Sequence, residues 1–238
     1  MCEHCGCGDK NHHSHDHSHD HGVETVRIEQ DVLAHNRAHA EALKARLDAA
    51  GARLVNIIGG PGSGKTELLS RLIPLVRVAH PAAVIEGDLA TDNDAERIRA
   101  TGAPVYQIET GTACHLSVHD IEHAVAHLGV PENGVLFVEN VGNLVCPALF
   151  ELGESLRMVC LSVTEGEDKP EKYPVAFIGA DCSVITKTDL LPYVDFDVER
   201  ATTLIRQIHP DATVHLTSAK QGEGLSKLAA HIGSLWHR

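Results

Sequence analysis

The sequence Gly59-Gly60-Pro61-Gly62-Ser63-Gly64-Lys65-Thr66 fits the pattern G-x-x-x-x-G-K-[ST]. It follows the apolar run 54–58 and precedes a segment whose apolar residues recur at helical spacing, at Leu68, Leu69, Leu72, Ile73 and Val76. Between a strand and a helix, glycines let successive backbone amides point inward, and the helix adds the positive end of its dipole. We therefore expect a phosphate-binding P-loop in which Lys65 reaches the β- and γ-phosphates and the Thr66 hydroxyl is placed for Mg²⁺.

Short apolar runs alternate with helical patterns through the rest of the chain. Candidate strands are 83–86, 105–108, 135–138, 158–163, 183–186 and 214–216. Candidate helices are 30–50, with Gly51 as its C-cap, and 117–128, 198–208 and 225–236. This alternation predicts an α/β P-loop NTPase fold, with a mostly parallel central sheet and helices on both faces.

Composition restricts the partners and the compartment. The net charge of −13 argues against a nucleic-acid partner, which demands a basic surface. No apolar run approaches the roughly 20 residues needed to span a bilayer, and no signal peptide is visible. The seven cysteines are unevenly placed, which favours reduced thiols over a disulfide framework. We expect a cytoplasmic protein that does not enter a membrane.

Residues 1–22 form a separate segment, and residues 23–238 are predicted to be the nucleotide-binding domain. Cys2, Cys5 and Cys7 lie within six positions and can wrap one thiophilic ion, square-planar for Ni(II) or tetrahedral for Zn(II). The run 11–21 alternates histidine with Ser and Asp and offers weaker imidazole sites. This segment is low in complexity and predicts a disordered metal-binding tail.

Carboxylates follow two of the predicted strands. Asp88 comes after the second strand and Glu139 ends the fourth. Because ligands bind at the carboxyl ends of parallel strands, both carboxylates are candidates to hold Mg²⁺ or to polarise the attacking water. Nearby carboxylates compete with Asp88 for this role, namely Glu86, Asp92 and Asp94.

The strand ends near the C-terminus carry a pattern that reads guanine in P-loop GTPases. Thr186-Lys187-Thr188-Asp189 is similar to their Asn-Lys-x-Asp element, with Thr in place of Asn, and Ser218-Ala219-Lys220 follows the last strand. Asp189 would accept from the guanine ring N1 and the exocyclic amine. ATP lacks that amine, so an unpaired carboxylate would disfavour it.

Two further cysteines lie in loops near the nucleotide strands. Cys114-His115 follows the third strand, and Cys146 lies in the glycine-containing loop after the fourth. Neighbouring strand ends could bring these three soft ligands together, and a two-fold contact could complete their shell. Cys160 and Cys182 lie in or beside apolar strands, and we expect both to be small buried hydrophobes.

Over essentially its whole length the sequence resembles the hydrogenase nickel-incorporation GTPases, P-loop GTPases of the SIMIBI class. The shared motifs are Cys2-x-x-Cys5-Gly6-Cys7, the histidine-rich tail, residues 59–66, Gly111-Thr112-Ala113-Cys114-His115 and Glu139-Asn140-Val141-Gly142-Asn143-Leu144-Val145-Cys146-Pro147. The resemblance implies a GTP-dependent homodimer with nickel at the N-terminal thiols. It also implies a second nickel or zinc site from Cys114, His115 and Cys146 at the dimer contact. The implied partners are a zinc-containing maturation protein and the [NiFe]-hydrogenase large-subunit precursor.

The expected function is that of a GTP-hydrolysing nickel metallochaperone whose dimerisation and metal binding depend on the nucleotide. No obvious water-positioning glutamine is visible, so we expect slow hydrolysis. A urease-type nickel-insertion GTPase is the nearest alternative, although the N-terminal cysteine motif and the Cys114-His115 pair argue against it. A nickel storage protein acting through its histidine tail is another alternative. A small-molecule P-loop kinase would have little use for Asp189.

Overall fold

The computed structural model describes residues 20–88 and 93–237, without the side chains of residues 20–32, 88 and 93. The chain divides into two compact units, Met1–Ala34 and His35–Arg238. The described part of the first unit is the beginning of helix α1 (Asp20–Ala49). The predictions for Cys2, Cys5, Cys7 and residues 11–19 fall outside the described residues, whereas residues 20–22 of the predicted tail are already helical.

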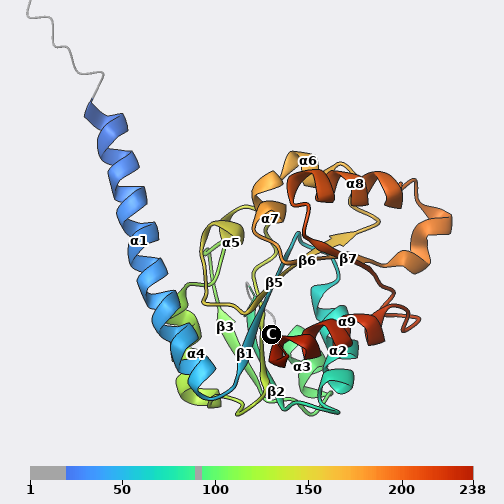
Figure 1. The fold of residues 1–238 in the computed structure, drawn as a ribbon, viewed down its shortest axis with the longest axis horizontal. Helices are drawn as coiled ribbons and strands as arrows, with labels where there is room; N and C mark the ends of the chain where they lie inside the picture. Colours follow the sequence, from blue (N-terminus) through green and yellow to red (C-terminus); the bar gives the residue numbers. More distant parts are fainter. Residues whose placement is uncertain (1–19, 89–92, 238) are drawn as a thin grey trace, which may run out of the picture. The chain divides into compact units, whose positions relative to one another are not determined.

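The second unit is built on one seven-stranded sheet (Figure 1). Its strand order is β3-β2-β4-β1-β5-β6-β7, and every neighbouring pair is parallel. The carboxyl ends of all the strands therefore meet at one edge. The strands are β1 (Arg53–Gly59), β2 (Ala82–Asp88), β3 (Val105–Glu109), β4 (Val135–Glu139), β5 (Leu156–Ser162), β6 (Cys182–Thr186) and β7 (Thr213–Leu216).

Helices cover both faces of this sheet because strand side chains alternate between them. In β1, Val55 and Ile57 belong to one core with α2 (Lys65–Val76), α3 (Asn93–Arg99) and α9 (Leu225–Gly233). Leu54 faces the other side, in a core with the end of α1 and with α4 (Val118–Leu128). Ile58 extends that side toward α5 (Cys146–Leu149), α7 (Pro174–Ile178) and α8 (Val198–Ile208).

Local signals explain where several helices begin and end. The Ser117 side chain accepts from the Asp120 amide, and the Asp120 carboxylate accepts from the Ser117 amide, which forms a complete capping box for α4. At the end of α1, Gly51 has φ +67, its amide donates to the Asp48 carbonyl, and the Ala52 amide donates to the Leu47 carbonyl. This pair of bonds is a Schellman motif.

The predicted α/β fold is confirmed, and each predicted strand is present with small shifts of its ends. Helix α1 is longer than predicted, since it begins at Asp20 rather than near residue 30. The sequence pattern did not predict α3 or the short elements α5, α6 (Lys169–Lys172), α7 and η1 (Thr188–Tyr193). Among the described residues, no helix is both long and apolar enough to cross a membrane.

Candidate functional site

The glycine-rich loop connects β1 to α2, as its sequence predicts. Gly62 has φ +74 and Gly64 has φ +88, a left-handed conformation that L side chains rarely adopt. Gly64 is also the N-cap of α2, so the first amides of this helix face the cavity beside the loop. The loop thus places a helix N-terminus and its own amides around one space, as phosphate binding requires.

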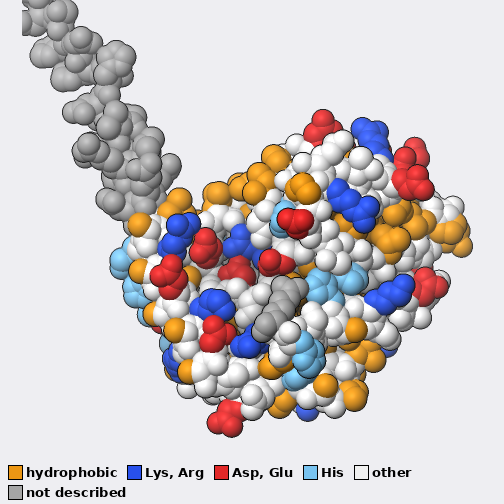
Figure 2. All heavy atoms as spheres, in the orientation of Figure 1, with side chains coloured by type: hydrophobic (Ala, Val, Ile, Leu, Met, Phe, Trp, Pro, Cys, Tyr) orange, Lys and Arg blue, Asp and Glu red, His pale blue; other side chains and the backbone are white. Residues whose placement is uncertain are grey.

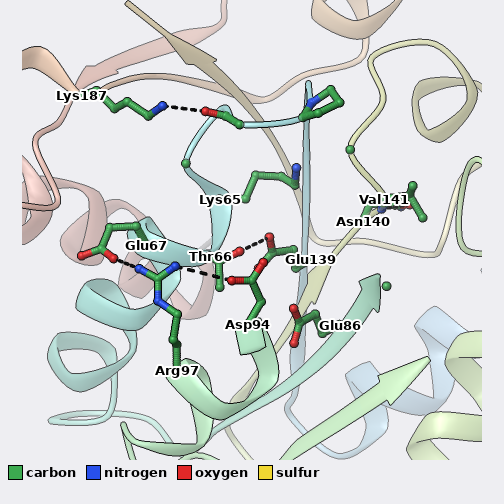
Figure 3. A pocket seen from close by; sticks show the side chains of 15 residues that line it. Lys65, Thr66, Glu67, Glu86, Asp94, Arg97, Glu139, Asn140, Val141 and Lys187 are labelled. Atoms are coloured by element: carbon green, nitrogen blue, oxygen red, sulfur yellow. Dashed lines mark hydrogen bonds and ion pairs between the residues drawn. The ribbon is translucent and has the colours of Figure 1, made fainter. Parts of the chain in front are cut away.

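A cavity of about 380 Å³ lies against this loop. Figure 3 shows the Lys65, Thr66 and Glu139 side chains in it. The Lys65 ammonium donates to the carbonyl oxygens of Gly59 (3.3 Å) and Gly60 (3.4 Å). Long contacts of this kind to backbone carbonyls are readily exchanged for phosphate oxygens, because the ammonium is a point charge with three rotatable donors.

Oxygen ligands gather beside Lys65. The Thr66 hydroxyl donates to Glu139 Oε1 over 2.7 Å, and both side chains are less than a tenth exposed. The buried carboxylate of Glu86 lines the same cavity. A hydroxyl beside carboxylates is the donor set that Mg²⁺ prefers, so these residues fit that cation. Asp88 ends β2, and its side chain lies outside the described residues.

An ion-pair network on the wall of the phosphate cavity was not predicted. Arg97, on α3, pairs with Glu67 of α2 and with Asp94, 3.5 Å away (Figure 3). All three side chains line the phosphate cavity, so Arg97 adds a guanidinium near the predicted phosphates. The sequence named Asp94 only as a competitor of Asp88. The sequence signal that could have indicated this network is the charged segment Asn93–Arg99, which follows β2 after a few residues.

A second cavity of about 430 Å³ adjoins the first, and the two share Gly64, Glu67 and Lys187 in their linings. Asp189, Ala219 and Lys220 line it. The Asp189 carboxylate is held in place by the Ser218 hydroxyl, which donates to Asp189 Oδ1 over 2.7 Å. The predicted base-recognition residues therefore converge beside the P-loop, although they come from two separate loops.

Thr186 and Lys187 connect this second cavity to the P-loop. The Thr186 hydroxyl donates to the Ser63 carbonyl over 2.6 Å, and the Lys187 ammonium donates to the Gly62 carbonyl over 2.7 Å. The threonine that replaces the usual asparagine thus still ties the end of β6 to the phosphate loop. Lys187 itself has φ +60, a left-handed conformation that directs the chain into η1.

The thiols of Cys114 and Cys146 are neighbours, and these two residues come from the loop after β3 and from the start of α5. A hydrogen bond with the Cys146 thiol, followed by burial, raises the pKa of Cys114. Cys114 Sγ lies 3.6 Å from His115 Nδ1. The His115 ring stacks on Phe150 with ring centroids 4.1 Å apart, and burial lowers its pKa. Cys114 therefore has both other residues as near neighbours, but the donor atoms of Cys114, His115 and Cys146 do not all lie within 4.8 Å of one another, and the imidazole packs against an aromatic ring.

Asparagine side chains connect these loops to the nucleotide side. Asn140, directly after Glu139, is almost fully buried, and its Oδ1 accepts from the amides of Leu116 (3.1 Å) and Val141 (3.0 Å). Asn143 Nδ2 donates to the Cys114 carbonyl over 3.5 Å. The segment that contacts Thr66 is thus bonded to the loop that carries Cys114. Both asparagines belong to the motif 139–147, but their sequence pattern predicted no role for them.

Cys160 and Cys182 are buried in β5 and β6, as predicted. Burial raises the pKa of Cys160 to about 12. The positive charge of the nearby Lys65 lowers this pKa, but by less than burial raises it. Burial also raises the pKa of Cys182, so both thiols are protonated at neutral pH as long as no metal ion binds them.

Comparisons with known proteins agree with this geometry. Residues 54–216 match the family described as CobW/HypB/UreG, nucleotide-binding domain. The chain is 53% identical over 207 residues to the hydrogenase maturation factor HypB of Azotobacter vinelandii, covering 87% of this chain and 68% of the relative. It superposes on a nickel complex of HypB from Helicobacter pylori with a TM-score of 0.79 and 36% identity, covering 85% of this chain and 95% of that one. HypB from Archaeoglobus fulgidus gives a TM-score of 0.79 and 37% identity, with 86% and 100% covered. The chain belongs to the CobW/HypB/UreG family and, within it, to the HypB hydrogenase maturation factors.

Proposed function

We propose that this protein is a slow GTPase that acts as a nickel metallochaperone for the [NiFe]-hydrogenase large-subunit precursor. In this proposal it works in the cytoplasm as a homodimer and has a zinc-containing maturation protein as a partner. The family membership supports the maturation role, and the relatives named as hydrogenase factors favour hydrogenase over urease as the recipient. Nickel is the cargo, and GTP hydrolysis controls when it is held.

The GTPase part rests on the two adjoining cavities. The triphosphate would lie against the P-loop with Lys65 at its β- and γ-oxygens, and Mg²⁺ would be held by Thr66 with Glu139 or Asp88. The guanine would occupy the second cavity, where Asp189 accepts from its ring N1 and amine and Lys187 covers the base. In the reaction, water adds to the γ-phosphorus as its bond to the leaving GDP oxygen breaks. No glutamine is among the described residues lining the phosphate cavity, which supports a slow rate.

The metal part rests on the Cys114 and Cys146 thiols, which are close together at the protein surface. One chain supplies two sulfurs and the His115 imidazole, and that is one ligand short of a closed four-coordinate shell. Val145 and Leu149 on either side of Cys146 expose 41% and 49% of their surface. Apolar exposure around an incomplete site supports a dimer contact there. We also propose that nickel binds at Cys2, Cys5 and Cys7.

One observation carries the coupling between the two parts: a single segment touches both. Glu139 bonds the Thr66 hydroxyl, the next residue Asn140 bonds the Leu116 amide, and Cys146 ends the same loop. A γ-phosphate with Mg²⁺ would replace the contact between Thr66 and Glu139, and this would shift the segment that aligns the thiols. By reciprocity, metal occupancy must then change nucleotide affinity or dimerisation.

The test measures nickel affinity and dimerisation with GDP and with a non-hydrolysable GTP analogue, together with phosphate release from GTP. We expect both quantities to depend on the nucleotide. Equal nickel affinities together with equal dimer constants would rule the coupling out. Absence of GTP binding would rule out the GTPase part.

A further inference from the structure

Three metal-ligating side chains converge at a place that the proposed function does not use. Cys182 starts β6, His215 lies in β7 and His231 lies in α9. One ligand atom from each of these residues lies within 4.8 Å of the other two. Among the described residues, this is the one group of three Cys, His, Asp or Glu side chains that meets this distance.

The sheet register accounts for the convergence. Cys182 pairs with Thr213 and Val184 pairs with His215, so Cys182 and His215 point to the same face on adjacent strands. Cys182 and Val184 belong to the core beneath α9, which also contains Leu228 and Ile232 of that helix. His231 lies on the same helix, and its ring is placed beside His215, whose Nε2 is 2.9 Å from His231 Nδ1. Figure 2 shows histidine side chains at the surface over β7 and α9.

The distances suit a small tetrahedral cation. His215 Nε2 and His231 Nδ1 are 2.9 Å apart, and the two ring centroids are separated by 5.1 Å. A tetrahedral Zn²⁺ with ordinary Zn–N and Zn–S bonds sets its donor atoms roughly 3.3–3.6 Å apart. Small side-chain rotations therefore suffice. Since one of the two nitrogens donates to the other in the hydrogen bond, one ring must move its proton to its other nitrogen to present a lone pair.

The donors also have a suitable chemistry and setting. One sulfur with two imidazole nitrogens is a set for borderline cations such as Zn²⁺, Co²⁺ or Ni²⁺, and not for Mg²⁺. The thiol is fully buried, while both imidazoles are half-buried and can admit an ion with a water as its fourth ligand. Burial is the largest cause that lowers the pKa of His215, followed by His231 and Lys227, so this ring is neutral at neutral pH. The nearby Lys227 opposes a cation, and the thiol must lose its proton to solvent on binding.

We propose that Cys182, His215 and His231 form an intrachain site for a borderline divalent cation, with Zn²⁺ as its first candidate. The bound ion would join β6, the edge strand β7 and α9, which are otherwise held together by apolar packing and the strand ladder. The segments that line the guanine cavity, Thr186–Asp189 and Ser218–Lys220, leave these same two strands. Cys182 begins β6, at the opposite end of the strand from Thr186, so the site would brace these two strands away from that cavity and separately from the exposed thiol pair.

The test uses the full chain with Cys2, Cys5, Cys7, Cys114 and Cys146 replaced by serine, which leaves Cys160 and Cys182 as the remaining thiols. Co²⁺ is the probe, because sulfur-to-cobalt charge transfer reports a thiolate ligand and the histidine-rich tail gives none. We expect this absorption to saturate at one Co²⁺ per chain and to disappear when Zn²⁺ displaces the cobalt. Cys182→Ser should abolish the absorption. The matched control Cys160→Ser, at an equally buried thiol on the neighbouring strand, should leave it unchanged.

A second variant guards against misfolding. His231 is half-buried in α9, so His231→Gln should fold normally and leave the circular dichroism spectrum unchanged. The same variant should weaken Co²⁺ binding at least about tenfold, because it removes one ligand. No charge transfer in the five-serine chain would overturn the proposal, and so would unchanged absorption in Cys182→Ser. Should Cys182→Ser fail to fold, His231→Gln decides the question, since unchanged cobalt affinity in that variant also overturns it.

Discussion

The phosphate cavity and the surface thiol pair follow the carboxyl ends of neighbouring strands, but they differ in how complete they are. Lys65, Thr66 and Glu139 are at most 8% exposed, and each is already held in place by a hydrogen bond within the site. Cys114 is exposed, and the His115 ring packs on Phe150. A site for a phosphate can be built within one chain from backbone amides and a helix end, whereas four soft ligands are hard to assemble from three loop residues.

The largest expected effect is on the complete side of this comparison. Lys65→Ala should lower GTP turnover by about 10²–10³-fold, because it removes a cation from the transferring phosphoryl group. Lys44→Ala is the control, since Lys44 is an exposed lysine paired with Asp48 and lines neither nucleotide cavity. Phosphate release measures both variants, and similar losses in the two would contradict the assignment.

Asp189→Asn should weaken GTP binding by about 10- to 100-fold, since guanine would face a donor where it needs an acceptor. Xanthosine triphosphate, with a carbonyl in place of the exocyclic amine, should gain affinity in the same variant. The Ser218 hydroxyl can still donate to the remaining carbonyl oxygen, so the loop is retained. Competition against fluorescent GDP measures the change, and an unaltered preference for GTP would show that Asp189 does not read the base.

On the incomplete side, Cys114→Ser should weaken nickel binding by about tenfold or more because it removes a soft ligand. The measurement belongs in a chain whose Cys2, Cys5 and Cys7 are replaced by serine. Cys160→Ser provides the buried-thiol control and should retain nickel. GTP turnover without metal should be the same in both, and a parallel loss of turnover would mean that the two regions are not separable.

Asn140→Ala should disconnect the two regions. Removing the bond to the Leu116 amide should reduce the nickel–nucleotide coupling by about 1 kcal/mol, so that the affinity ratio between GDP and GTP-analogue states approaches one. Asn143→Ala removes only a 3.5 Å contact and should have a smaller effect. Nickel titrations in both nucleotide states measure this, and an unchanged ratio in Asn140→Ala would place the coupling elsewhere.

The smallest expected effect is on how the free energy of unfolding depends on pH below neutrality. Burial lowers the pKa of His115 in the folded protein, so the folded chain binds fewer protons than the unfolded chain just below pH 6.5. In metal-free protein, the free energy of unfolding should therefore fall as pH decreases through that window. His115→Gln should make this dependence slightly shallower in denaturant titrations at several pH values. An identical slope would mean that burial does not lower the pKa of His115 in the folded protein.

Much of the fold could be predicted because its signals are local. The glycine pattern at 59–66, the capping box of Ser117 and Asp120, and the alternation of apolar runs each act over a few neighbouring residues. Short elements such as α3 and α5 were not predicted, since a helix of one or two turns has little stability of its own and depends on packing.

The sequence predicted many of the residues of the candidate nucleotide site, but few of the contacts between them. Strand-end logic selected Glu139 and Asp189, but it gave no indication that Arg97 lines the phosphate cavity or that Thr186 bonds the Ser63 carbonyl. These contacts join residues far apart in sequence, and no spacing pattern records them.

By itself the sequence determined the P-loop, the alternation of strands and helices and the family, because glycine conformations, caps and hydrophobic periods depend on adjacent residues. The tertiary structure alone decided which side chains meet. The strand order placed Asn140 beside the Leu116 amide, and the register of β6 with β7 placed His215 on the same face as Cys182, under α9. Convergence of distant side chains is a property of sheet order and register, and both are set by the packing of the whole domain.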